Sequence, residues 1–109
     1  MKYMMIVCLD PSIERPPGGS GVDVESWVEE MDGRGVRLEG HPLEPSDATT
    51  VRVRDGQVLI SDGPFAETKE VMVGFDILEC ADLDEAIEVA ARHPLARRGA
   101  MELRPYGED

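Results

Sequence analysis

The chain has 109 residues, 41% of them hydrophobic, and its 23 acidic and 11 basic side chains give a formal net charge of −12. This length and apolar share predict one folded domain, residues 1–109, rather than a disordered chain. The excess of carboxylates excludes the electrostatic attraction to phosphate that nucleic-acid binding needs. We therefore expect no direct contact with DNA or RNA, whereas a basic partner protein remains compatible with this charge.

The first apolar segment, residues 2–9, predicts a strand that is apolar on both sides and lies inside a sheet. It stops at Asp10, has no small-residue cleavage site after it, and is far shorter than the roughly 20 residues that cross a membrane. We expect a cytoplasmic protein without a membrane segment. In that reducing compartment Cys8 and Cys80 remain free thiols.

A loop rich in proline and glycine follows, and then a helix is predicted from about residue 23 to 34. The apolar side chains of this helix recur at i, i+3, i+4 and i+7, which places Trp27 in the core. A second strand is expected over residues 36–43. The apolar face of the helix consists of Val24, Trp27, Val28 and Met31.

Residues 50–54 alternate strictly, and an extended run resumes at 57–60 after Asp55-Gly56. A two-residue Asp-Gly connection between extended runs predicts a β-hairpin, because both turn positions favour positive φ. Residues 71–80 form a long strand rich in β-branched residues, in which Gly74 indicates a bulge.

Asp82 and Glu85 have the spacing of a capping box and predict the start of a second helix. Pro94 disfavours helical geometry at the preceding residue and ends this helix. A last strand over 101–106 contains Pro105, which indicates an edge or a strand end. The expected buried face of the helix consists of Leu83, Ala86, Ile87, Ala90 and Ala91.

This order of elements predicts an α+β fold, a ferredoxin-like βαββαβ arrangement with an inserted β-hairpin. Two helices cover only one face of the sheet. The strands at 2–9 and 71–80 are nevertheless apolar on both faces, so the second face needs a cover. The simplest cover is a second copy of the chain, and we expect a homodimer.

The segment from Asp62 to Glu70, with the sequence DGPFAETKE, joins the hairpin to the long strand. It resembles the signature of the DGPF branch of the YCII-related proteins, and residues 48–56 and 82–86 also fit that pattern. The resemblance implies a dimeric α+β barrel, in which two sheets pack face to face. It also implies a link to extracytoplasmic-function sigma factors, beside which such proteins are often encoded.

Within this segment, Asp62 is a candidate catalytic base, since a carboxylate at a strand end can take a proton or bind a hydroxyl group. The alternative is that it accepts hydrogen bonds from residues 64–67 and closes the turn. Phe65 either anchors the loop or stacks on a ligand. Thr68 and Lys69 offer a donor and a positive charge for an anionic or carbonyl ligand, or else form a solvated turn.

Three further polar residues are candidates for the site. His93 is a second catalytic candidate at a helix C-terminus, where the macrodipole favours the protonated imidazole. His41 lies near the end of the second strand and either faces the same cleft or is exposed. Asp76, inside a strand, is either on a solvated face or in a partly buried cavity with a raised pKa.

The resemblance implies a His-Asp pair, with the histidine in the first helix and an Asp-Pro at the end of the second. Here the second helix ends in His93-Pro94, and the first contains no histidine. The pair therefore does not transfer residue by residue.

Neither a metal site nor a bound cofactor is expected, because Cys and His are not clustered and no phosphate-binding glycine loop follows a strand. Two hypotheses remain. One is a small-molecule binding protein or cofactor-independent enzyme with a pocket between sheet and helices. The other is a regulatory protein that contacts a sigma factor.

Overall fold

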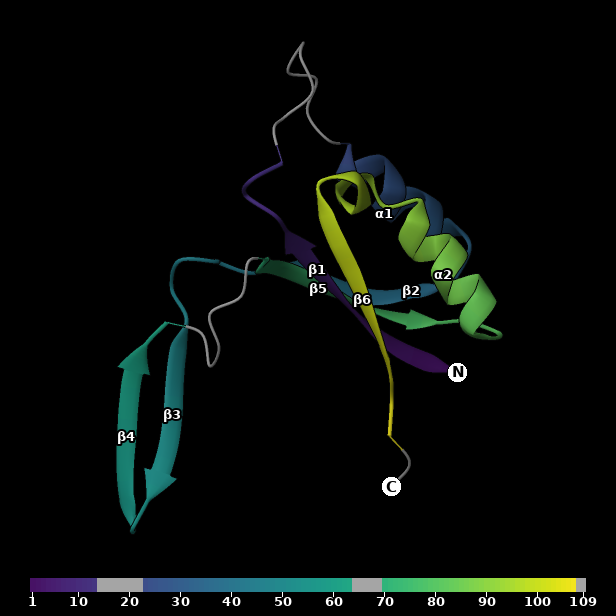
Figure 1. Ribbon diagram of the computed structural model, residues 1–109. Coiled ribbons are helices and arrows are strands. Elements are labelled where there is room, and N and C mark those ends of the chain that lie inside the picture. The colour runs from purple at the N-terminus through teal and green to yellow at the C-terminus, as the bar shows by residue number, and fades with distance from the viewer. Residues whose placement is uncertain (14–22, 64–69, 108–109) are drawn as a thin grey trace.

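Four strands and two helices form the body of the protein, and a separate hairpin extends from it (Figure 1). The computed structural model describes residues 1–13, 23–63 and 70–107. The elements are β1 (Lys2–Leu9), α1 (Val24–Gly33), β2 (Arg37–Pro42), β3 (Thr49–Arg54), β4 (Gln57–Asp62), β5 (Val71–Glu79), α2 (Leu83–Ala91), a 3-10 helix η1 (Pro94–Arg97) and β6 (Gly99–Pro105).

The sheet of the body has the strand order β2-β5-β1-β6, and all neighbouring strands are antiparallel. This is the ferredoxin-like order with β3 and β4 inserted as a hairpin, so the predicted α+β fold is confirmed. Pro105 ends β6, which is an edge strand as expected. The helix η1 was not anticipated from the sequence.

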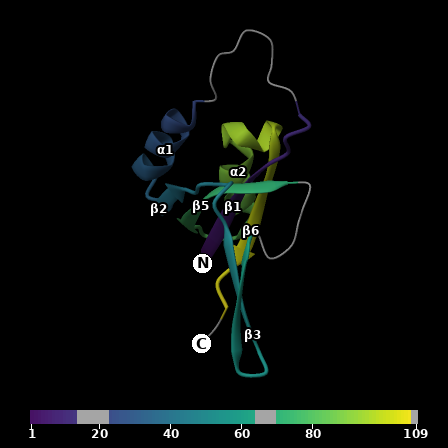
Figure 2. The same cartoon turned by 90° about the vertical axis from the view of Figure 1, so that its left-hand side faces the viewer.

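Both helices lie on one side of the sheet (Figures 1 and 2). Between them and the sheet lies a core that includes Tyr3 and Met5 from β1, Trp27 and Met31 from α1, and Leu78 from β5. Trp27 is therefore a core residue, and its indole nitrogen donates to the carbonyl oxygen of Val89 at 3.0 Å. No helix of residues 1–13, 23–63 and 70–107 lies on the opposite face of the sheet.

The buried face of α2 differs from the expected one. Ala86 and Ala90 are buried as predicted, but Leu83 and Ile87 are each 50% exposed, and Val89 is fully buried instead. Ala91 is exposed as well. Small side chains and one valine therefore form the buried side of this helix. The larger Ile87 borders a shallow groove shared with Met101 and Leu103 of β6, among other residues.

Local signals in the sequence placed the caps and turns correctly. Asp82 accepts a hydrogen bond from the Glu85 amide at 2.9 Å, while the Glu85 carboxylate accepts one from the amide of Ala81 at 2.8 Å. The Glu85 side chain thus binds the amide of Ala81, one residue before the N-cap Asp82, rather than the amide of Asp82 itself. In the hairpin, Asp55 and Gly56 have φ of 52° and 74°, the positive values that a type I′ turn requires.

A bulge interrupts the pairing of β1 with β5, where the register shifts between Val7 and Cys8. Val7 pairs with Gly74 and Cys8 with Met72, so Val73 is the extra residue. A bulge changes which side chains share a face. Because of it, Met72 is exposed, whereas Gly74, Asp76 and Leu78 share the buried side of β5.

Candidate functional site

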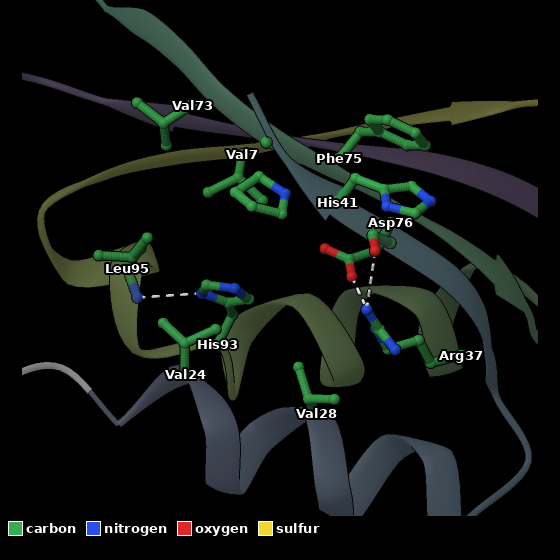
Figure 3. Close-up of a pocket in the computed structure, with 13 residues that line it drawn as sticks. Val7, Val24, Val28, Arg37, His41, Val73, Phe75, Asp76, His93 and Leu95 are labelled. Carbon is green, nitrogen blue, oxygen red and sulfur yellow. Dashed lines mark hydrogen bonds and ion pairs between the residues drawn. The ribbon is translucent and has the colours of Figure 1, made fainter. Parts of the chain in front are cut away.

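A cavity of about 270 Å³ lies between the sheet, α1 and η1 (Figure 3). Its walls are mainly aliphatic side chains, from β1, α1, β5 and η1. Ligand sites usually have volumes of about 300 to 1,000 Å³, so this cavity suits a small molecule. The main wall residues are Val7, Val24, Val28, Val73 and Leu95.

Asp76 of β5 is the carboxylate of this cavity and is only 7% exposed. Its Oδ1 accepts a hydrogen bond from Nε of Arg37 at 2.8 Å. Burial raises the pKa of Asp76, and the contact with Arg37 offsets only part of that increase. A carboxylate with a raised pKa is a stronger base than an exposed one. Of the two interpretations of Asp76, the partly buried cavity with a raised pKa is therefore correct.

Arg37 of β2 joins the site to α1. Its Nη1 donates to Asp32 Oδ1 at 3.1 Å, and its Nη2 donates to the carbonyl oxygen of Gly40 at 3.3 Å. Burial lowers the pKa of Arg37, but the hydrogen bonds to Asp76 and Asp32 outweigh this and raise it. The guanidinium is therefore a fixed positive charge that holds the Asp76 carboxylate in one orientation.

Gly40 makes room for this carboxylate. It lies opposite Asp76 in the pairing of β2 with β5, and a Cβ atom at this position would overlap the Asp76 carboxyl group and the Arg37 guanidinium. A glycine inside a strand commonly marks such a close approach.

His93 is the second titratable group of the cavity and is 3% exposed. Its Nδ1 accepts a hydrogen bond from the Leu95 amide at 3.1 Å, which assigns the proton of the neutral ring to Nε2. The ring packs against Trp27 with centroids 4.6 Å apart. The second ring nitrogen points away from Leu95, toward the side of the cavity where Asp76 lies (Figure 3).

The expectation that the helix end keeps His93 protonated is wrong. Burial lowers the pKa of this imidazole from 6.5 to about 4, so the ring is neutral at physiological pH. Desolvation of the charged form outweighs the attraction of the helix C-terminus, because the ring lies between Trp27 and the cavity wall. His93 thus presents an uncharged N–H donor.

His41 lies at the edge of the cavity, but its imidazole is on the other face of the sheet. Its ring contacts that of Phe75, with centroids 5.7 Å apart, and Nε2 lies 3.2 Å from the Glu39 carboxylate. Both rings lie on the side of the strands away from Arg37 (Figure 3). Of its two predicted placements, His41 adopts the exposed one.

The remaining predicted site residues are not brought together with Asp76 and His93 by the part of the chain that the structure describes. Asp62 is exposed at the end of β4 and does not line the cavity. Phe65, Thr68 and Lys69 lie outside the described residues, as do the amides that would close the turn at Asp62. Their roles, and the catalytic role of Asp62, remain predictions.

Sequence reasoning missed Arg37, Gly40 and the valine walls. One signal was present: a carboxylate in an otherwise apolar strand needs a cation on a neighbouring strand. No group of three or more metal-binding side chains occurs among residues 1–13, 23–63 and 70–107. No helix in the same ranges is long and apolar enough to cross a membrane.

The fold and the cavity together define a ferredoxin-like α+β protein with a small, mainly apolar cavity that contains a buried carboxylate and a neutral imidazole. The family model of the YCII-related domain matches residues 1–108 of the chain. It belongs to the YCII-related family, as the resemblance of its sequence predicted.

An uncharacterized protein of Rhizobium meliloti (strain 1021) is 45% identical over 98 residues, which cover 73% of this chain and 79% of the relative. A solved structure of the 5-chloro-2-hydroxyhydroquinone dehydrochlorinase TftG from Burkholderia phenoliruptrix AC1100, in complex with 2,5-dihydroxybenzoquinone, aligns with a TM-score of 0.44 and 12% identity. That alignment covers 100% of this chain and 96% of the other.

Proposed function

We propose that the cavity binds a small, mainly apolar carbonyl compound and transfers a proton on it without a cofactor. The observation that carries this proposal is that Asp76 and His93 share one apolar cavity while having opposite pKa shifts. When the surroundings shift the pKa values of two neighbouring groups in opposite directions, one group commonly acts as a base and the other as a hydrogen-bond donor. Here the carboxylate is the base, and the neutral imidazole is the donor.

The reaction follows from these two roles. Asp76 removes a proton from the carbon next to the carbonyl group, and the electron pair moves to the carbonyl oxygen. The Nε2–H group of His93 donates a hydrogen bond to that oxygen as its negative charge develops. Asp76 then returns the proton to another carbon of the same molecule, so the net result is an isomerisation with no atom gained or lost.

Arg37 has a positioning role in this proposal. It holds Oδ1 of Asp76 at 2.8 Å, which leaves Oδ2 as the oxygen available to a ligand. It also contacts Asp32 at the surface, so the guanidinium is shared between the site and α1. Its positive charge offsets the repulsion that a buried carboxylate would otherwise exert on an electron-rich ligand.

A fragment panel of small aliphatic and aromatic ketones tests the proposal. Ligand binding is measured by thermal shift, and proton abstraction by loss of the α-proton NMR signal in D₂O. We expect binding by the wild type, binding without exchange by Asp76→Asn, and neither by Val28→Phe, which fills the cavity. Leu83→Phe is the matched control, because it adds the same ring at a position that is half exposed. If α-proton exchange persists in Asp76→Asn, Asp76 is not the base.

A second copy of the chain covers the open face of the sheet, giving a cytoplasmic homodimer. Supporting this, the face opposite the helices presents Met4 and Ile6 from β1 beside Ile77 and Phe75 from β5, paired as neighbours. The flanking strands carry charged groups on that face, including Glu102 of β6 opposite Ile6. An apolar centre with a polar rim is typical of a protein interface. Light scattering after size exclusion tests this, with Ile77→Glu expected to give a monomer.

An alternative function is regulatory contact with an extracytoplasmic-function sigma factor. The net charge of −12 favours a basic partner. Titration calorimetry with such a sigma factor from the same organism, at low and at high salt, tests this alternative. Binding that disappears at high salt is the expected result. If binding is absent at low salt, this function is excluded.

A further inference from the structure

One face of the β3–β4 hairpin carries four branched apolar side chains, and the Thr49–Asp62 pair lies on the same face at the base of the hairpin. Val51 pairs with Ile60, and Val53 with Val58, so these four residues lie on the same side of the hairpin. Each of them is between 58% and 68% exposed. The other side carries mainly polar residues, Thr50, Arg52, Arg54, Gln57 and Ser61, together with Leu59.

The base of the hairpin is fixed to the chain that flanks it. The Thr50 hydroxyl donates to the Gly63 carbonyl oxygen at 2.7 Å, and the Gly63 amide donates to the Ala48 carbonyl oxygen at 2.8 Å. The type I′ turn at Asp55 and Gly56 matches the natural twist of the two strands. Even so, a two-stranded hairpin alone is marginally stable in water and needs a further surface to pack on.

The hairpin extends on the side of the sheet opposite to the helices (Figures 1 and 2). The Cα radius of gyration is 16.0 Å, whereas a compact domain of about this length has a radius of about 13 Å. The chain therefore does not fold the hairpin back onto its own body. The hairpin instead projects on the same side of the molecule as the open, apolar face of the sheet.

We infer that the β3–β4 hairpin is a clasp that packs its Val51, Val53, Val58 and Ile60 face against a second copy of this chain. This inference rests on the homodimer proposed above. A partner docked on the open sheet face lies on the same side as the hairpin, so the clasp continues that interface. Sheets pack about 10 Å apart, and a six-residue strand spans about 20 Å, so the hairpin extends well past the sheet of the partner.

Symmetry and charge both favour a second copy over another partner. In a two-fold dimer each protomer gives one hairpin and receives one, so both apolar surfaces are covered with no open end. The Val/Ile face itself has no charge among its four residues, whereas the chain as a whole has a net charge of −12. Contact through these four uncharged side chains, which lie beyond Asp62 at the base of the hairpin, adds little repulsion between two strongly acidic copies.

The test is the dimer dissociation constant, measured by sedimentation and light scattering on full-length protein. Val53→Glu combined with Val58→Glu adds two negative charges to the apolar face, and we expect it to weaken the dimer at least 100-fold. Gln57→Glu combined with Ser61→Glu adds the same charge to the polar face and serves as the matched control. We expect the control to weaken the dimer less than fivefold.

Hydrogen exchange gives a second readout that does not depend on a variant folding well. Amides of β3 and β4 in the wild type should be protected above the dissociation constant and lose that protection on dilution. The inference is overturned if both double variants behave as the wild type, if both weaken the dimer equally, or if hairpin protection does not change with concentration. A wild type that is monomeric throughout overturns it too, whereas ketone binding by that monomer would leave the proposed cavity function standing.

Discussion

Gly40 of β2 lies directly opposite Asp76 of β5, in a pairing where any side chain at position 40 would overlap the Asp76 carboxyl group. The Asp76 carboxyl group thus occupies the space that a side chain at position 40 would fill. The position of the Asp76 carboxylate therefore depends on the glycine that is paired with it on the neighbouring strand.

Gly40→Ala should therefore lower the free energy of unfolding by about 1 to 3 kcal/mol, the usual effect of overpacking. The new methyl group displaces Asp76 from Arg37 and should also weaken ketone binding. Urea denaturation and ligand thermal shift measure the two effects. Gly33→Ala is the control, since no atom lies within 4 Å of its added Cβ. Equal stability of the two variants would contradict the close approach at Gly40.

Arg37→Met should destabilise the protein by about 3 to 5 kcal/mol, because it leaves the buried Asp76 carboxylate without its cation. The double variant Arg37→Met/Asp76→Asn removes that uncompensated charge and should recover most of the loss. A double-mutant cycle in urea at neutral pH measures the coupling. Additive effects of the two substitutions would show that the pair is not coupled.

Asp76 makes stability depend on pH in the opposite direction to an ordinary paired carboxylate. Its pKa is raised in the folded state, so the folded protein binds the proton more tightly than the unfolded chain. The contribution of Asp76 therefore falls as pH rises from about 4 through the raised pKa, and is constant above it. Subtracting the pH profile of Asp76→Asn from that of the wild type isolates this slope. A difference that increases with pH would reverse the assigned shift.

His93 should destabilise the protein in acid. Its pKa is lowered to about 4 in the folded state, so the unfolded chain binds the proton first as pH falls below 6.5. Stability is then lost between about pH 6.5 and pH 4, by roughly 3 kcal/mol at most. His93→Gln should remove this part of the pH dependence, whereas His41→Gln at the exposed position should not. NMR titration of the imidazole protons checks the pKa directly.

Gly56→Ala should destabilise the hairpin by about 1 to 2 kcal/mol, since a φ of 74° is strained for any residue with a Cβ. The body of the protein should be unaffected. Hydrogen exchange distinguishes the hairpin from the body of the protein. We expect faster exchange in β3 and β4 but unchanged exchange in β1 and β5. Equal loss of protection in both parts would show that the hairpin is not an independent unit.

The sequence was sufficient to predict the order of the strands and of the two α-helices, though not η1, because each of them depends on local signals. The alternation before Asp55 and after Gly56, the cap at Asp82 and the apolar spacing around Trp27 act within a few residues. The predicted strand at 36–43 became β2, Arg37–Pro42, and the one at 101–106 became β6, Gly99–Pro105, differences of one or two residues at most ends.

The site could be predicted only in part, because it depends on register and burial. Asp76 and His93 were candidates from the sequence, but Arg37 reaches Asp76 only through the pairing of β2 with β5. That pairing includes an irregularity between Arg37 and Glu39, which no periodicity in the sequence indicates. The pKa of His93 depends on burial against Trp27 and η1, which are contacts between distant segments. This burial lowers the pKa, whereas the helix end alone would raise it.

The Arg37–Asp76 contact joins strands that are 39 positions apart in the chain, and His93 enters the cavity from a third segment. An unfolded chain therefore holds no part of the cavity in place, and we expect the proposed ketone ligand to bind the folded state alone. Occupancy and global folding are then thermodynamically linked, and a ligand at 100 times its dissociation constant would stabilise the whole domain by about 2.7 kcal/mol. Under the proposed function, a supply of that ligand would therefore lower the fraction of unfolded chain that proteases can cleave.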